Sequence, residues 1–259
     1  MDWYKVNKVL GFSDETIEKI RDFFYNLSRR NIKLTEKEKQ LCQSVGIDPR
    51  LAKIIKSHNV SEIKILPSIL DYRNLDFEKS GLDGICAFYV RKDDESMEEI
   101  HRIIYRNKQK YLDKGYTLFY FDGKQYGEYY MALAKNKTTS DILRWQQTNG
   151  INHGLDNSDV IAKIEEWQQQ YDLVLWGCGR DWLHIFFIHE QPKYDFQLGA
   201  TNEKYHKKHK LWNERTPKFK KFADEVIQFC PDSITQIYRN KTELIKEMER
   251  MNGIYLWWD

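Results

Sequence analysis

The sequence predicts an α+β protein: one or more mixed or antiparallel sheets flanked by helices, with an N-terminal helical cap. The first observation is that short β-branched or aromatic runs recur between glycine, proline, asparagine and aspartate residues, as strands do. The second is that the apolar residues between these runs recur at three- and four-residue spacing, which is typical of helices that bury one face. The 259 residues include 41% hydrophobic and 31% charged side chains, a balance that supports a self-sufficient core and excludes wholesale disorder.

Residues 1–60 predict the helical cap. The first helix is indicated by apolar side chains at helical spacing, namely Ile17, Ile20, Phe24 and Leu27. A second helix follows the capping-box pattern of Thr35 and Glu38, in which each side chain bonds the other residue's backbone N–H. A third helix begins with Asp48 as N-cap and Pro49 at the first helical position, where an N–H has no partner within the helix.

Residues 61–137 predict a ββαββ-like half. Its elements are two strands, a helix and two further strands, at residues 63–66, 84–90, 95–114, 116–121 and 125–134. The strands are rich in β-branched and aromatic residues, and the helix keeps its apolar residues at helical spacing. Gly115 follows the helix at a position that favours glycine, and the turn at residues 122–124 is expected to join the last two strands as a hairpin.

Residues 138–259 predict a C-terminal domain, with a soft boundary at residues 136–139. Its elements in chain order are a helix from Thr138, a polar loop at 151–157, a helix over 160–167, strands at 173–179 and 182–188, helices from Thr216 and Thr242, and a strand at 254–258. A charged stretch, residues 193–216, interrupts this order before the helix from Thr216.

Charge and cysteine content narrow the class of protein. The 41 Lys and Arg against 39 Asp and Glu leave a net charge of +2, which is no global reason to expect nucleic acid or a membrane as partner. No basic start with a long apolar run follows Met1, and no stretch is apolar enough to span a bilayer, so we expect a cytoplasmic protein. The cysteines are widely spaced, which favours reduced thiols: Cys42, Cys86, Cys178 and Cys230. We expect no cofactor.

Three aspartates are candidates for chemistry because each follows the end of a predicted strand or helix. Asp181, Asp232 and Asp259 could together hold a divalent cation or share a proton. The alternatives are a turn residue, an N-cap and a terminal charge, respectively. Cys178 or Cys230 could act as a nucleophile if His184 or His189 lay within reach, although a structural histidine in an apolar strand is the simpler interpretation.

Candidate binding residues fall into two groups. The first comprises Asn152 and His153 in the polar loop, together with Trp182 and Trp258; Trp257 and Trp258 should point to opposite faces of the last strand. The second is the segment 203–221, which contains eight Lys or Arg and only two Glu. Its candidate residues are Lys207, Lys208, Lys210 and Trp212. Such a segment could contact phosphate, as in a nucleic acid or nucleotide, or an acidic partner; the alternative is the solvated basic face of a loop and helix.

The residues from about 130 onward also carry a resemblance. The runs that carry it are Asp141-Ile142-Leu143, Thr148-Asn149-Gly150-Ile151-Asn152, Asp159-Val160-Ile161-Ala162-Lys163 with Trp167, Asp181-Trp182, Phe229-Cys230-Pro231-Asp232 and Tyr255-Leu256-Trp257-Trp258-Asp259. Together they resemble the bacterial family catalogued as domain of unknown function 4253. The resemblance implies a shared fold unit and a bacterial or phage source, and it implies no activity. The chain departs from the family pattern at His153, where Tyr is common, at the insertion 193–216, and at 235–242, which lacks the usual glycines.

Two functional classes remain open. The first is a non-enzymatic protein that binds a protein partner, of the kind that acts in immunity or defence. The second is a metal-assisted hydrolase that acts on a phosphate-containing substrate, with Asp181 and Asp232 as metal ligands or acid–base groups.

Overall fold

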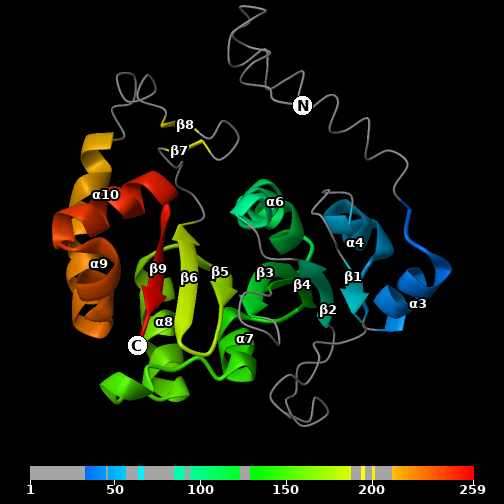
Figure 1. Cartoon of the computed structure of the whole chain (residues 1–259), viewed down its shortest axis with the longest axis horizontal. Coiled ribbons are helices and arrows are strands. Elements are labelled where there is room, and N and C mark those ends of the chain that lie inside the picture. The colour runs from blue at the N-terminus through cyan, green and yellow to red at the C-terminus, as the bar shows by residue number, and fades with distance from the viewer. Residues whose placement is uncertain are drawn as a thin grey trace, which may run out of the picture.

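The computed structural model describes residues 33–44, 46–56, 64–66, 85–90, 94–122, 129–187, 194–195, 200–201 and 212–259 (Figure 1). The predicted helix from Ile17 to Leu27 and the candidates Lys207, Lys208 and Lys210 lie outside these residues. Trp212 is the first residue of a helix, and its side chain is not among the described parts.

Within the described residues, seven strands form one mixed sheet in the order β1-β2-β4-β3-β5-β6-β9. Adjacent strands are antiparallel except β3 and β5, which are parallel. The strands are Lys64–Leu66 (β1), Ile85–Val90 (β2), Tyr116–Asp122 (β3), Tyr129–Lys135 (β4), Leu173–Cys178 (β5), Trp182–Phe187 (β6) and Gly253–Trp257 (β9). The predicted α+β class with a mixed or antiparallel sheet is confirmed, and the sheet runs through both predicted halves of the chain.

The helices match the predicted order. They are Glu36–Ser44 (α3), Pro49–Lys56 (α4), Asp94–Leu112 (α6), Thr139–Gln146 (α7), Asn157–Gln170 (α8), Trp212–Phe229 (α9) and Lys241–Met251 (α10), with a 3-10 turn at Ile151–His153 (η1) and a π-helix at Ser233–Tyr238 (η3). Helix α9 starts at Trp212 and not at Thr216, so the prediction of its start was wrong. Pro217 lies inside the helix and forgoes one backbone hydrogen bond. Tyr194–Asp195 (β7) and Ala200–Thr201 (β8) pair within the charged stretch.

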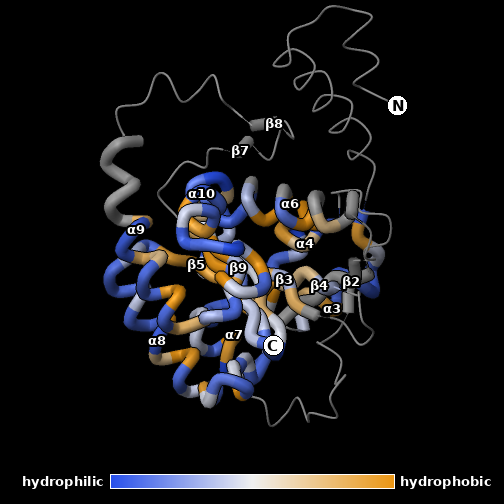
Figure 2. The backbone as a smooth tube through the Cα atoms, turned by 60° about the vertical axis from the view of Figure 1, so that its left-hand side comes forward, coloured by the Kyte–Doolittle hydropathy of each residue, from blue (hydrophilic) through white to orange (hydrophobic). Residues whose placement is uncertain are grey.

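Each face of the sheet has its own hydrophobic core. Helices α7, α8, α9 and α10 pack on one face, and α3, α4 and α6 pack on the other, which confirms the predicted helical cap for the part that the structure describes (Figure 1). Strand β3 shows the alternation that divides the two cores, because Phe119 and Phe121 point to the first and Leu118 and Tyr120 to the second. Helices α8 and α9 carry both hydrophilic and hydrophobic segments, as amphipathic helices do (Figure 2).

A buried polar pair explains His184, which the sequence placed in an apolar strand. The Tyr120 hydroxyl lies 3.0 Å from Nδ1 of His184. Burial lowers the pKa of His184 well below its ordinary value, so the imidazole is neutral. Tyr120 also requires Gly177 on the adjacent strand, because a Cβ there would lie 2.3 Å from Cε1 of the tyrosine ring. The histidine therefore has a structural role in the second core.

None of the helices in the described ranges combines the length and the apolar composition needed to cross a membrane.

Candidate functional site

Four segments that are distant in sequence meet at one end of the sheet, at the chain end marked C in Figure 1. They are residues 149–154, 179–181, 230–233 and 257–259, which we call the loop cluster. Hydrogen bonds connect them in a closed circuit. Asn149 N–H donates to the Arg180 carbonyl (2.8 Å), and Trp258 N–H donates to the Asp181 carbonyl (2.9 Å). Asp259 N–H donates to Oδ2 of Asp232 (3.1 Å), and Asp232 returns to the first segment through His153.

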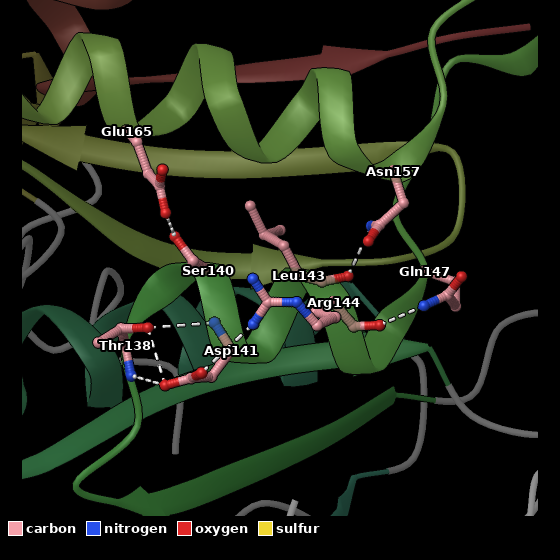
Figure 3. Close-up of polar contacts among 8 residues, drawn as sticks. All are labelled: Thr138, Ser140, Asp141, Leu143, Arg144, Gln147, Asn157 and Glu165. Atoms are coloured by element: carbon pink, nitrogen blue, oxygen red, sulfur yellow. Dashed lines mark hydrogen bonds and ion pairs between the residues drawn. The ribbon is translucent and has the colours of Figure 1, made fainter. Parts of the chain in front are cut away.

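The first segment is a fixed loop between α7 and α8. Gly150 and Leu155 exchange two backbone hydrogen bonds of 2.9 and 3.1 Å across the 3-10 turn. Helix α8 then begins with a capping box in which Asp156 and Asp159 bond each other's backbone N–H. Nδ2 of Asn157 donates to the carbonyl at the end of α7, Leu143 O, at 2.9 Å (Figure 3). The loop is therefore held at its base and at both ends.

The two helices that carry this loop are also tied to each other. The Ser140 hydroxyl of α7 donates to Oε1 of Glu165 of α8 at 2.6 Å (Figure 3). Helix α7 has its N-cap at Thr138, as the sequence predicts, with a capping box formed by Thr138 and Asp141, and it ends at Gln147 with a left-handed φ of 55°. The loop cluster thus rests on a helix pair whose ends are defined by specific side chains.

Gly150 and Trp258 join the first and last segments by direct packing. A Cβ on Gly150 would lie 2.7 Å from Cδ1 and 3.0 Å from Nε1 of Trp258, so only glycine fits beneath the loop. Trp258 is 2% exposed and packs edge-on against Phe229. Its Nε1–H has no hydrogen-bond acceptor among the described residues. The candidate binding residue Trp258 therefore lies in the first core.

His153 and Asp232 form the closest polar contact of the cluster. Nε2 of His153 lies 2.6 Å from Oδ2 of Asp232, and the two side chains are 29% and 12% exposed. Burial alone would raise the pKa of Asp232, but the hydrogen bonds from Asp259 N–H and from His153 outweigh it and hold the pKa below its ordinary value. Asp232 precedes the π-helix, yet its side chain makes no capping bond to the helix backbone. Its role is to join three segments and not to cap a helix.

Cys230 is the first residue of the segment 230–233 and is buried. Its thiol donates to the Trp257 carbonyl at 3.2 Å. Burial raises the pKa of the thiol, which disfavours the thiolate that a nucleophile requires. Cys230 is therefore a small buried side chain that also donates a hydrogen bond to a backbone carbonyl.

The three candidate aspartates come together only in part. Asp232 contacts Asp259 through the backbone N–H, and Asp181 contacts Trp258 through its backbone carbonyl. The side chains of Asp181 and Asp259 are exposed. Across the residues that the structure describes, no group of three His, Cys, Asp or Glu side chains is arranged to hold a metal ion.

The surface of the loop cluster has one feature that the sequence did not single out. Ile151 is 68% exposed, and among the residues that the structure describes it is the one large hydrophobic side chain that is exposed. Asn152 and Gly154 beside it are exposed as well. The candidate Trp182 lies elsewhere, because it is 6% exposed and stacks on Tyr120 in the second core.

The π-helix beside the cluster covers the free edge of β9, the last strand of the sheet. The Tyr238 hydroxyl donates to the Tyr255 carbonyl (3.1 Å) and accepts from the Tyr255 N–H (3.3 Å). These are the groups with which β9 would otherwise pair a further strand. The next residue, Arg239, has a φ of 59° and a ψ of −36°, in the segment where the sequence lacks the glycines of the family pattern.

All four segments of the loop cluster lie within one family match. The model of the family described as domain of unknown function (DUF4253) matches residues 130–207 and 210–259. The C-terminal half of this chain belongs to the DUF4253 family. The resemblance identified from the sequence runs is thus confirmed, and the runs around Asn149, Asp181, Asp232 and Trp258 are the parts of the DUF4253 unit that meet in space. No curated protein and no solved structure matches the chain.

Proposed function

We propose that this chain is a non-enzymatic cytoplasmic protein that binds a protein partner through the loop cluster. The observation that carries the proposal is the exposure of Ile151, at 68%. It lies on a loop whose backbone is held by hydrogen bonds of Asn149, Gly150 and Leu155. Covering a large exposed apolar side chain with a partner removes it from water, which makes the free energy of binding more favourable. Complete burial of such a side chain contributes about 2 kcal/mol, equivalent to about 30-fold in Kd.

The rigidity of the loop supports the same proposal. Binding orders side chains and loops at a cost, and a loop that is already ordered avoids most of that cost. The contacts of Asn149, Gly150 and Leu155 fix the backbone on both sides of Ile151 before any partner arrives. A role in immunity or defence is part of the proposal by analogy with other small bacterial binding proteins.

The test uses the tagged protein as bait in an extract of its source organism, with Ile151→Asp as the second bait. We expect one protein in near-equal amount with the wild-type bait and at least a tenfold loss with the variant. Lys53→Asp is the matched control, because it places the same side chain at an exposed site on α4, on the side of the molecule away from the loop cluster (Figure 1). Recovery of the bait alone, under crosslinking as well, would contradict the proposal.

A second candidate function rests on the contact between His153 and Asp232. A carboxylate 2.6 Å from a partly exposed imidazole can orient it as a general base for hydrolysis of a phosphate-containing substrate. His153 would then be the acid–base group and Asp232 the carboxylate that orients it, and Mg²⁺ or Mn²⁺ would assist. Thermal unfolding with these ions and with nucleotides tests this candidate, since binding to the folded state raises the Tm. An unchanged Tm together with no phosphate release would remove it.

A further inference from the structure

The amine of Lys108 lies against three aromatic rings. Lys108 is near the end of α6, the helix that covers the second core, and its side chain is half-buried. Its Nζ lies 5.4 Å from the ring centroid of Tyr105 and 5.5 Å from those of Trp176 and Phe186. Trp176 and Phe186 are fully buried and stack on each other. The amine therefore has an aromatic floor on one side and partial access to water on the other.

Among the described residues, no carboxylate balances the charge of Lys108. It makes neither an ion pair nor a hydrogen bond with them, whereas Lys56 and Lys163 each pair with a glutamate. Removing an ammonium from water costs free energy, which an opposite charge normally offsets. The ring faces attract the cation and offset only a part of this cost. Burial lowers the pKa of Lys108 from its ordinary value of 10.5 to about 8.

An amine in this environment is a nucleophile at neutral pH. Only the neutral form has the free electron pair that attacks a carbonyl carbon. At pH 7 about 10% of an amine with a pKa of about 8 is neutral, against about 0.04% of an ordinary exposed lysine. The less basic amine is also less nucleophilic, by about tenfold if amines follow the slope known for thiols, and partial burial reduces its access. The remaining advantage is on the order of fivefold to tenfold in rate.

We infer that Lys108 is an acylation site, whose amine accepts a short acyl group from a thioester. The Nζ electron pair attacks the thioester carbonyl carbon, the C–N bond forms, the C–S bond breaks, and the thiol leaves with the proton from nitrogen. A thioester suits an amine that acts without a partner, because a thiolate leaves readily. The product is a neutral amide, which the aromatic surroundings accept at a lower cost than an ammonium. The rings belong to the second core and not to the loop cluster, so this inference goes beyond partner binding.

The experiment treats the folded full-length protein with the acetyl thioester of N-acetylcysteamine, at pH values from about 6.5 to about 10. The amines that remain free are then acetylated in denaturant with deuterated acetic anhydride. Fragment-ion mass spectrometry of the peptides gives the fraction acetylated by the thioester at each lysine. Lys110 and Lys114 are the internal controls, because both are exposed and lie at the same end of α6.

At pH 7 we expect Lys108 to react about fivefold or more faster than Lys110. The rate at Lys108 should level off above about pH 8, because its amine is then mostly neutral, whereas the rate of an ordinary exposed lysine rises up to about pH 10. Tyr105→Ala removes one ring and admits water, so the rate at Lys108 should level off at a higher pH. Slower reaction at Lys108 than at Lys110 at pH 7, or a rate that rises in parallel with the controls up to pH 10, would overturn the inference.

Discussion

Replacing Gly150 by alanine tests how the loop cluster is held together. The substitution adds one methyl group at a φ of −121°, a negative value that alanine adopts, so that backbone strain does not contribute. The new Cβ would lie 2.7, 2.9 and 3.0 Å from Cδ1, Cγ and Nε1 of Trp258. The indole cannot turn away, because it is 2% exposed and packs against Phe229 with the ring centroids 5.7 Å apart.

The expected loss follows from two opposing terms. Overpacking a closed site costs about 1–3 kcal/mol, whereas replacing glycine by alanine in the unfolded chain gains about 0.4–1 kcal/mol. We therefore expect Gly150→Ala to lower the free energy of unfolding by about 1–2 kcal/mol. Urea unfolding followed by tryptophan fluorescence measures this loss, and an unchanged slope with denaturant shows that only the folded state is affected.

A double-mutant cycle identifies the cause. Phe is smaller than Trp, so in a Trp258→Phe background the added methyl group should cost less than it does in the wild type. Additive losses for the two substitutions, or a Gly150→Ala variant as stable as the wild type, would refute the argument that Trp258 is what requires glycine at this position.

Three further predictions concern residues beside the cluster. Asp232→Asn removes the charged partner of His153 and should cost about 2 kcal/mol at pH 7. The pKa of Asp232 in the folded state lies below its unfolded value of about 3.9, so its contribution to the free energy of unfolding is complete above that pH. The contribution is lost as the pH falls through the folded pKa. The free energies of unfolding of wild type and variant should therefore become equal in acid. Arg239→Gly should raise the free energy of unfolding by about 0.5–1 kcal/mol, because glycine adopts the φ of 59° without strain. The control Arg144→Gly in helix α7 should lower it by about 1 kcal/mol. If thermal unfolding shows that both variants are stabilised or both destabilised, the assignment of strain to Arg239 is contradicted. Tyr238→Phe leaves both backbone groups of Tyr255 without their partner and should cost about 1–3 kcal/mol, with faster amide exchange at Tyr255 by NMR; an unchanged exchange rate would show that the hydroxyl does not protect this strand.

Local patterns account for the elements that the sequence predicted well. The predicted capping box of Thr35 and Glu38 forms with hydrogen bonds of 2.7 and 3.2 Å between residues three positions apart, so the chemistry that starts the helix is visible in the sequence itself. The division of β3 between two cores follows from alternation alone, as Phe119 and Tyr120 illustrate. Such signals depend only on neighbouring residues.

The start of α9 shows where local patterns fail. Thr216 followed by Pro217 is a typical helix beginning, yet the helix starts at Trp212. A proline is tolerated inside a helix when the surrounding structure makes up for the lost hydrogen bond, and that compensation has no sequence signature.

The candidate site was predicted residue by residue but not as an arrangement. Asp232 and His153 were both singled out, although nothing in the spacing of 79 positions between them indicates a contact at 2.6 Å. In the sequence Gly150 is only one member of the run at residues 148–152, and its close approach to Trp258 depends on how the chain closes on itself. The exposure of Ile151 is also invisible in the sequence, because an apolar residue in a loop between two helices is as often buried.

The pairing of β6 with β9 has a consequence for the order in which the domain assembles. Trp182 of β6 pairs with Trp257 of β9, and the intervening chain includes α9, the π-helix and α10. Until ribosomal synthesis reaches Gly253, β6 has an open edge that is ready to pair with another nascent chain. During the translation of about seventy residues, the nascent chain therefore exposes an unpaired β6 edge that is prone to aggregation. In the finished fold β9 covers this edge.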